Sequence, residues 1–151
     1  MFSDGVVLTG LLFDESRDIA GWRDGGIERE VPVFRETRLW LDAYFDGRKT
    51  KARPPFRLYG STPFRDEVLR EVGKIPFGGT VTYGEIAAAL AKRRGVSRIS
   101  SQAVGGAVGW NPICLMIPCH RVIGCGGRLV GYGGGLANKK ALLKHEGVET
   151  D

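Results

Sequence analysis

The feature that most constrains this fold is a basic, proline-containing segment at residues 48–59. Its Pro54-Pro55 pair cannot continue a helix, because proline lacks a backbone N–H and drives the preceding residue into extended conformations. We therefore predict an extended linker that divides the chain into an N-terminal lobe, residues 1–58, and a second domain, residues 59–151. At 151 residues the chain is long enough to bury a sizeable core.

The N-terminal lobe is predicted to combine strands with one helix. β-branched runs bounded by Asp and Gly predict strands at residues 6–13 and 19–22, with a turn at residues 14–18 between them. At residues 33–45 apolar side chains recur at helical spacing, and Gly47 follows as a helix stop. This order of elements indicates a small α/β lobe.

Four helices are predicted beyond the linker. Their start signals are, in chain order, Thr62-Pro63, the capping box Thr82-Tyr83-Gly84-Glu85, Ser100 or Ser101, and Leu136. The second and third of these helices, joined by a basic turn, resemble a helix-turn-helix, although many such pairs are only packing units. The third contains Gly105, Gly106 and Gly109, each costing up to ~1 kcal/mol against alanine in a helix. Either a phosphate backbone or another helix should therefore approach that face closely.

The excess of positive over negative charge lies entirely in the last part of the chain, residues 92–151. Residues 1–91 hold 13 Lys and Arg against 14 Asp and Glu, whereas residues 92–151 hold 9 against 3, a net charge of +6. Such a segment fits an acidic partner, nucleic acid first, or else a solvated basic face. The uncharged stretch at residues 99–120 is broken by polar residues, prolines and glycines, so we expect no membrane helix.

Three cysteines fall within twelve residues, at Cys114, Cys119 and Cys125. An odd number without a secretory signal predicts free thiols in a reducing compartment, and hence a cytoplasmic protein. Their spacing lacks the close pairs of structural zinc sites, so we expect no metal. Cys114 is interpreted as a buried apolar residue and Cys125 as a loop thiol without a role.

A candidate nucleophile stands in Pro118-Cys119-His120-Arg121, at the end of an apolar run predicted to be a strand at residues 111–117. Cysteine reacts as the thiolate, which a neighbouring imidazole or guanidinium favours. Adjacent strand residues point to opposite faces, so Cys119 and His120 can cooperate only if the backbone turns there or a water links them. The alternative is that Cys119 is only a small buried residue.

These residues carry a specific resemblance to a known family, the O6-alkylguanine-DNA alkyltransferases. The matching segments are Ile75-Pro76-Phe77-Gly78, Val81-Thr82-Tyr83, Asn111-Pro112, Ile117-Pro118-Cys119-His120-Arg121-Val122, Gly131-Tyr132, Gly134-Gly135-Leu136 and His145-Glu146-Gly147. They align in order over residues 62–147, whereas the N-terminal lobe matches only loosely.

The resemblance implies an α+β fold, with a small N-terminal α/β lobe that is ribonuclease H-like in the family and a mainly helical C-terminal domain with a winged-helix-like helix-turn-helix. It implies direct-reversal DNA repair, in which O6-alkylguanine, and also O4-alkylthymine, is flipped from duplex DNA through the minor groove. The alkyl group would pass irreversibly and once to Cys119, making the protein a methylated-DNA–[protein]-cysteine S-methyltransferase. We expect a cytoplasmic monomer that needs no cofactor.

The resemblance also implies roles for single residues. Glu146 would orient His120, which deprotonates Cys119 through a water, while Tyr83 assists protonation of the leaving guanine and Asn111 braces the turn. The implied substrate-binding residues are Val122, Tyr132, Gly133, Gly134 and Arg121. The implied DNA-binding residues are Tyr83, Arg94, Arg98, Ser101, Gln102, Ala103, Gly105 and Gly106.

Three departures from the family pattern stand out. Gln102 occupies the position of the arginine that enters the base stack, Gly133 replaces a serine, and the turn at residues 92–100 is longer than usual. Three other functions remain to be separated: a lesion-binding alkyltransferase-like protein without repair activity, a regulatory DNA-binding protein, and a cysteine hydrolase. The first lacks an acceptor thiol, the second has no use for a reactive cysteine, and no hydrolase signature is present.

Overall fold

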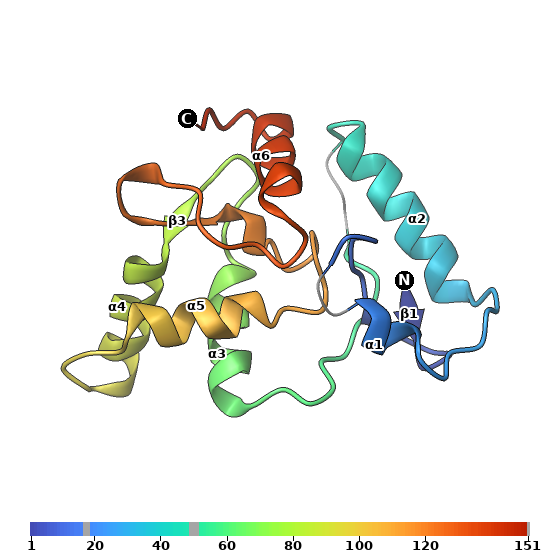
Figure 1. Ribbon diagram of the computed structural model, residues 1–151, viewed down its shortest axis with the longest axis horizontal. Coiled ribbons are helices and arrows are strands. Elements are labelled where there is room, and N and C mark those ends of the chain that lie inside the picture. The colour runs from blue at the N-terminus through green and yellow to red at the C-terminus, as the bar shows by residue number, and fades with distance from the viewer. Residues whose placement is uncertain (17–18, 49–51, 151) are drawn as a thin grey trace.

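A computed structural model describes residues 1–16, 19–48 and 52–150 of the chain. The predicted turn at residues 14–18 and the predicted linker at residues 48–59 therefore lie partly outside the described residues, at 17–18 and 49–51. The fold mixes helices with two very small sheets, and the N-terminal elements lie to one side of the remaining helices (Figure 1).

The N-terminal lobe contains a short hairpin and two helices. Its elements are β1 Phe2–Ser3, β2 Leu8–Gly10, α1 Ile19–Arg23 and α2 Pro32–Phe45. The predicted helix is confirmed as α2, which buries Trp40 and Tyr44 and is followed by Gly47 in the left-handed region at φ 66°. Only three residues of the strand predicted at residues 6–13 form β2, which pairs antiparallel with β1.

The strand predicted at residues 19–22 is wrong, because these residues form the helix α1. Trp22 gives the physical reason: its ring packs against Phe2 with ring centroids 5.3 Å apart. A side chain at Gly10 would come within 3.0 Å of the same ring, so the glycine leaves the space that the indole fills. Packing on the hairpin therefore outweighs the β-branched pattern of this run.

Three of the helices beyond the linker pack against one another. They are α3 Pro63–Val72, α4 Tyr83–Arg94 and α5 Ser101–Gly109. The predicted start signals are confirmed, since Thr62 and Ser100 accept backbone N–H groups of the first turns, and Thr82 and Glu85 form a capping box. Hydrogen bonds to neighbouring residues thus fix where each helix begins. The helix α5 lies along the edge of the pocket described below.

The remaining elements are short ones around the Pro-Cys-His-Arg segment and one last helix. They are β3 Val81–Thr82, the 3-10 helix η1 Cys119–Arg121, β4 Val122–Ile123, the 3-10 helix η2 Cys125–Gly127 and α6 Leu136–His145. β4 pairs in parallel with β3, with Val81 opposite Val122. The start of α4 and the end of η1 are therefore held side by side.

The strand predicted at residues 111–117 is also wrong. Only Ile113 forms a single β-bridge, with Leu11 of the N-terminal lobe, and the run then folds into tight turns with Leu115 at φ 68°. The Asn111 side chain explains this, because it binds the N–H of Ile113 at 3.0 Å and the carbonyl of Ile117 at 2.9 Å. Such local side-chain hydrogen bonds compete with a strand ladder.

The N-terminal lobe is tied to the segment that carries the cysteines. The N–H of Leu11 donates to Pro112 at 2.8 Å, and its carbonyl accepts the N–H of Cys114 at 2.8 Å. Leu8 and Leu11 also belong to the same buried apolar cluster as Val68 and Ile117. Backbone pairing and a shared core thus fix the position of this segment.

Candidate active site

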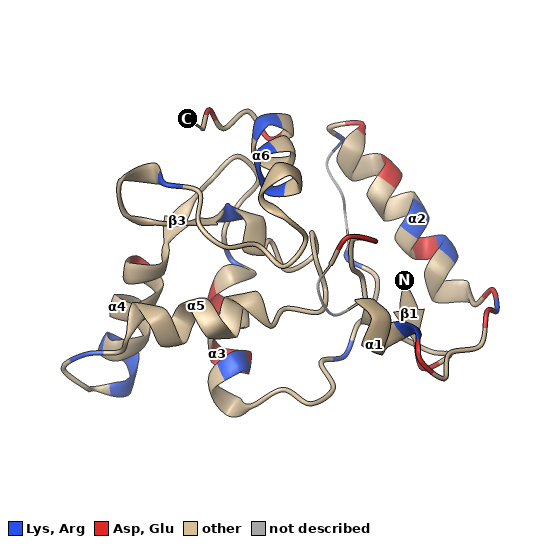
Figure 2. Cartoon of the chain, viewed as in Figure 1, with Lys and Arg blue, Asp and Glu red and all other residues tan. Residues whose placement is uncertain are grey.

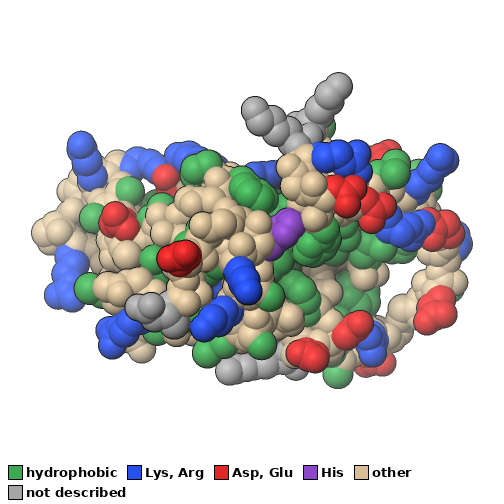
Figure 3. Space-filling view, turned by 90° about the horizontal axis from the view of Figure 1, so that it is seen from above, with side chains coloured by type: hydrophobic (Ala, Val, Ile, Leu, Met, Phe, Trp, Pro, Cys, Tyr) green, Lys and Arg blue, Asp and Glu red, His purple; other side chains and the backbone are tan. Residues whose placement is uncertain are grey.

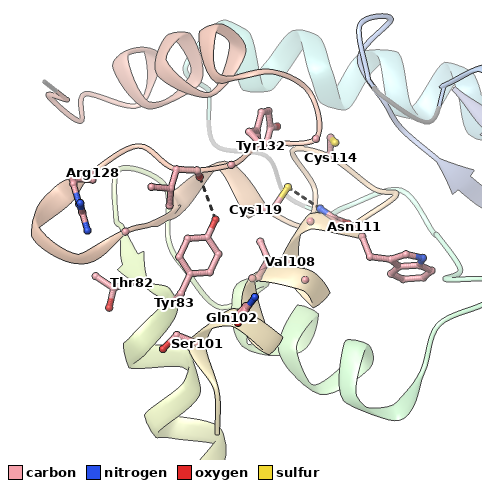
Figure 4. A pocket seen from close by; sticks show the side chains of 18 of the residues that line it. Thr82, Tyr83, Ser101, Gln102, Val108, Asn111, Cys114, Cys119, Arg128 and Tyr132 are labelled. Carbon is pink, nitrogen blue, oxygen red and sulfur yellow. Dashed lines mark hydrogen bonds between the residues drawn. The ribbon is translucent and has the colours of Figure 1, made fainter.

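Cys119 lies in a pocket of about 1060 Å³. The pocket is bounded by α5, by the loop before α6 and by the segment after β2 (Figure 4). The predicted site residues that line it are Tyr83, Ser101, Gln102, Gly105, Gly106, Asn111, Cys119, Tyr132 and Gly133. The structure therefore brings the proposed nucleophile and part of the proposed DNA-binding helix to one cavity.

Asn111 holds the sulfur of Cys119. Its Nδ2 donates to Cys119 Sγ at 3.0 Å, while its two backbone contacts fix the amide itself (Figure 4). An N–H donor at the sulfur favours the thiolate over the thiol. The pKa of Cys119 is lowered, first by a hydrogen bond from the Cys114 thiol and then by Asn111 and the charge of Lys139, against the opposing effect of burial.

The backbone turns between Cys119 and His120, as their cooperation requires. Both belong to the 3-10 helix η1, and the His120 side chain is fully buried. His120 Nε2 lies 2.7 Å from Glu146 Oε1, whereas its Nδ1 has no hydrogen-bond partner in the described part of the chain. The predicted pairing of His120 with Glu146 is thus present in the structure.

The Glu146 carboxylate is buried and accepts several hydrogen bonds. Arg121 donates to both of its oxygens, at 2.7 and 2.8 Å, and the N–H of Gly78 donates at 3.1 Å. Tyr44 Oη donates to Oε1 at 2.6 Å from helix α2. Burial raises the pKa of Glu146, but the hydrogen bonds from His120, Arg121 and Tyr44 outweigh burial and hold that pKa well below its usual value.

These contacts settle the tautomer of His120. Because Glu146 is ionised, it can only accept, so His120 Nε2 carries a hydrogen and donates it. In the neutral ring Nδ1 then bears a lone pair and can accept a proton. Burial lowers the pKa of His120, although Glu146 acts in the opposite direction, so the ring is neutral at neutral pH and available as a base.

Two members of this network are not foreseen from the sequence. Tyr44 is 102 residues from Glu146, and no spacing rule connects them. Lys139 is fully buried in α6, where its Nζ donates to the carbonyls of Val122 at 2.6 Å and Val130 at 3.0 Å. Its position three residues before Leu142 places it on the apolar face of α6, a signal that could have identified it.

Lys139 places a positive charge close enough to Cys119 to affect its pKa. Burial lowers the pKa of Lys139 to about 8, partly offset by the negative charge of Cys119. The same attraction acts on Cys119, whose pKa it lowers. Lys139 therefore fastens the loop before α6 and favours the thiolate at the same time.

Two tyrosines flank the thiol. Tyr83 Oη donates to the carbonyl of Val130 at 3.4 Å, and the pKa of Tyr83 is raised by burial and by the charge of Cys119. The Tyr132 hydroxyl is buried without a hydrogen-bond partner among the described residues, and its ring meets Phe13 edge-on at 6.1 Å between centroids. Both hydroxyls are therefore protonated and able to donate.

Three residues predicted to bind substrate lie away from the cavity lining. Arg121 is turned to the other side, where its guanidinium binds Glu146 and the carbonyl of Ile75 at 2.7 Å, because a buried charge needs partners. Gly134 packs so closely on Phe13 that a side chain would lie 2.5 Å from the ring. Val122 is fully buried, and its carbonyl accepts the Lys139 ammonium.

One face of α5 is open. Ser101, Gln102, Ala103 and Gly106 are exposed on it. At Gly106 and Gly109 an added side chain would meet no other part of the described chain within 4 Å, so no helix packs there. Packing against another helix of the described chain therefore does not explain this pair of glycines.

The basic residues between α4 and α5 differ in their availability. Arg94 forms a bidentate ion pair with Glu67 at 3.0 Å, and Arg93 pairs with Glu71. Arg98 is exposed on the turn before α5. Figure 2 shows basic residues at this turn and on α6, and Figure 3 shows acidic side chains gathered toward the end of the molecule that holds α2.

Neither a metal-binding cluster nor a membrane-spanning helix occurs among the described residues. No group of three or more His, Cys, Asp or Glu side chains there is arranged to hold a metal ion. Among the same residues, no helix is both long enough and apolar enough to cross a bilayer.

Comparison with known proteins places the chain in a family. Residues 63–148 match the family described as "6-O-methylguanine DNA methyltransferase, DNA binding domain". The methylated-DNA–protein-cysteine methyltransferase of Haemophilus influenzae is 35% identical over 98% of this chain and 79% of its own length. That of Mycobacterium leprae is 41% identical over 94% of this chain and 81% of its own.

Solved structures agree with these sequence relatives. The Mycobacterium tuberculosis OGT in complex with DNA superposes with a TM-score of 0.79 at 38% identity, covering 96% of this chain and 83% of that one. The O6-methylguanine-DNA methyltransferase of Pyrococcus kodakaraensis gives a TM-score of 0.63 at 28% identity, covering 97% and 89%. The chain therefore belongs to the O6-methylguanine-DNA methyltransferases, a family of methylated-DNA–protein-cysteine methyltransferases that repair DNA by direct reversal.

Proposed function

We propose that this chain removes the alkyl group from O6-alkylguanine in duplex DNA and keeps it on Cys119. The observation that carries the proposal is the position of Cys119 Sγ, held by Asn111 at 3.0 Å on the wall of an open pocket. Beside it lies a neutral His120 whose Nε2 is occupied by Glu146 at 2.7 Å. A nucleophile, a base and the group that orients the base are thus joined in one buried unit.

The transfer is a displacement at a saturated carbon. The Cys119 proton passes through a water to His120 Nδ1, which has no other hydrogen-bond partner in the described chain. The thiolate then attacks the alkyl carbon, forming an S–C bond as the C–O6 bond breaks. Guanine leaves with the electron pair and takes up a proton. The thioether has no leaving group of comparable quality, so each molecule acts once.

Tyr83 is proposed as the donor of that proton. Its hydroxyl lies at the pocket on a weak 3.4 Å hydrogen bond to Val130, which a base entering the pocket can replace. The raised pKa of Tyr83 keeps the hydroxyl protonated in the free protein. The charge of the Cys119 thiolate is one cause of that rise, so Tyr83 becomes a better donor as the thiolate is consumed.

We further propose that α5 enters the minor groove and that the target base is flipped into the pocket. The exposed face of α5 and the pocket share Ser101, Gln102 and Gly106, so DNA on this helix has its bases at the pocket mouth. The open space at Gly106 and Gly109 allows a close backbone approach. Arg98 and Ala103 are proposed to contact the same duplex, with Gln102 taking the place of the flipped nucleotide.

Further proposals concern the fold of the two domains, the oligomeric state, the cellular location and a second substrate. We propose a ribonuclease H-like N-terminal lobe, residues 1–58, and a winged-helix-like helix-turn-helix within residues 59–151, whose recognition helix is α5. Because the pocket and the Glu146 network need no residue from a second copy, we propose that the protein acts as a monomer. We also propose a cytoplasmic location and activity on O4-alkylthymine.

The experiment is a single-turnover transfer from a duplex with a labelled O6-methyl group. We expect label on Cys119 up to one equivalent, none on Cys119→Ala, and normal transfer in Cys125→Ala, which removes an exposed thiol. Tight lesion binding without transfer would identify an alkyltransferase-like binding protein, and binding without lesion preference a regulatory protein. Release of labelled product with repeated turnover would identify a hydrolase.

A further inference from the structure

A second thiol lies beside the proposed alkyl acceptor. Cys114 and Cys119 are both buried, with 4% and 5% of their surface exposed, and both line the same pocket. Each thiol shifts the pKa of the other, so the two sulfurs lie near each other, and Figure 4 shows both side chains in the wall of the cavity. Neither is part of a disulfide.

The backbone holds the two thiols in one short turn. The N–H of Ile117 donates to the carbonyl of Ile113 at 3.0 Å, which closes the turn around Leu115 in the left-handed region. Cys114 is anchored through its own N–H to Leu11 at 2.8 Å, and Cys119 through its sulfur to Asn111. The pair is therefore a fixed feature of the pocket wall and does not depend on mobile loops.

The two thiols of this pair differ in reactivity. The hydrogen bond from Cys114 lowers the pKa of Cys119, while the pKa of Cys114 is raised by the same contact and by burial. Cys119 is thus the more readily ionised thiol of the two, and Cys114 is the less readily ionised one. A thiolate facing an open pocket is the form that peroxides oxidise, and oxidation beyond the sulfenic acid is irreversible.

We propose that Cys114 is the resolving thiol of a reversible oxidation of Cys119 by hydroperoxides. The Cys119 thiolate attacks one peroxide oxygen, the O–O bond breaks, and hydroxide leaves, which gives a sulfenic acid. The Cys114 sulfur then loses its proton and attacks Cys119 Sγ, and the S–O bond breaks with release of water. Two thiols are oxidised to one disulfide, and hydrogen peroxide is reduced to two waters. A dithiol reductant restores both thiols by exchange.

Tyr132 is placed to stabilise the sulfenic acid of Cys119 by donating a hydrogen bond to it. Its buried hydroxyl has no hydrogen-bond partner in the described part of the chain and approaches both sulfurs. An oxygen added to Cys119 Sγ would supply the missing acceptor. Cys125 lies in η2 and also lines the pocket, but unlike the two buried cysteines it is exposed, so it serves as the control thiol.

Disulfide formation between the two cysteines does not depend on the proposed function. Its effect on repair does, because that effect assumes that Cys119 is the alkyl acceptor. While the disulfide exists, the acceptor is blocked and also protected from sulfinic acid. A protein that uses its thiol once loses its whole function by overoxidation, so the second thiol preserves unreacted molecules through an oxidative episode.

The test is peroxide treatment of the full chain without DNA, followed by alkylation of free thiols and digestion with trypsin. Residues 99–121 form one tryptic peptide that contains both cysteines. We expect this peptide to lose two hydrogens, to resist alkylation, and to regain two alkylation sites after dithiothreitol. Methyl transfer should vanish with the peroxide and return with the reductant.

Cys114→Ala and Cys125→Ala separate the outcomes, each compared with its own untreated sample. Treated Cys114→Ala should carry sulfinic acid on Cys119 and recover less than about a tenth of its transfer, because no reductant in the assay reverses that product. Cys125→Ala should behave as the parent. Sulfinic acid on Cys119 of the parent, or equal recovery in both variants, overturns the proposal. If the untreated parent transfers no methyl group, the proposed function fails while the peptide measurement still decides this inference.

Discussion

Tyr44 Oη donates a 2.6 Å hydrogen bond to Glu146 Oε1, joining helix α2 of the N-terminal lobe to the carboxylate that holds His120. The Tyr44 ring is buried and stacks on Trp40 at 5.8 Å between centroids. Burial and the contact with Glu146 raise the pKa of Tyr44, so the hydroxyl stays protonated. The N-terminal lobe thereby contributes directly to the position of the base.

Tyr44→Phe should weaken both stability and transfer. One charge-assisted hydrogen bond is lost, which costs about 1–2 kcal/mol of the free energy of unfolding. His120 is then held less firmly, and the single-turnover rate should fall by up to about tenfold. Urea unfolding and labelled-methyl transfer measure the two effects. Tyr59→Phe, which removes a half-exposed hydroxyl, is the matched control, and an equal change in that variant would count against the link.

Asn111→Asp should move the transfer rate to higher pH. The substitution replaces the N–H that donates to Cys119 Sγ with a carboxylate oxygen, so a donor is lost and a negative charge is added. Both changes raise the pKa of Cys119, and the thiolate fraction at neutral pH falls. We expect a rate about tenfold or more below the parent at pH 7, recovering as the pH rises.

A profile of the transfer rate from pH 6 to 10 checks this prediction. Asn138→Asp is the matched control, since Asn138 donates only to the carbonyl of Gly134 at 2.7 Å. A uniform loss of rate at every pH would mean that Asn111 acts only by bracing the turn.

Local signals in the sequence predicted α3, α4 and α5 well, because each of these helices begins with a side-chain cap. Thr62, the capping box of Thr82 and Glu85, and Ser100 all mark helix starts that the structure contains. Two strands were predicted wrongly for different reasons. Trp22 packs on Phe2, which is distant in the sequence, whereas the Asn111 amide binds nearby backbone groups in place of a strand ladder.

The residues of the candidate site likewise differ in whether the sequence could reveal them. Cys119, His120 and Glu146 could be named because their motifs are local and specific. The contacts of Tyr44 and Cys114 depend on how distant or turned segments meet, which no spacing indicates. Interpreted from sequence as an inert apolar residue, Cys114 lies against the proposed nucleophile.

Lys139→Met should destabilise the protein more at pH 10 than at pH 8. The pKa of Lys139 is about 8 in the folded state and about 10.4 in an unfolded chain. Between these values the unfolded chain binds more protons, so Lys139 adds stability as pH rises, by at most about 1.4 kcal/mol per pH unit. The variant lacks this rise and leaves the carbonyls of Val122 and Val130 without their donor. Urea unfolding from pH 7 to 10, with exposed Lys140→Met as control, measures the difference, and parallel curves would refute the linkage.

Gln102→Arg should strengthen repair of duplex DNA. Gln102 is exposed at the start of α5 and lines the pocket mouth, but it brings no charge to the phosphates or the opened base stack. Arginine there adds a cation and a stacking plane, so we expect duplex affinity to rise about two- to tenfold and binding to depend more steeply on salt. Leu39→Arg adds the same charge at an exposed position of α2, outside the proposed DNA-binding helix, and controls for net charge alone. Single-turnover transfer from duplex and single-stranded substrates separates base flipping from binding. A gain in transfer confined to the duplex supports the position of Gln102 at the base stack. Equal gains in both variants would mean that the added charge acts only by attracting DNA in general.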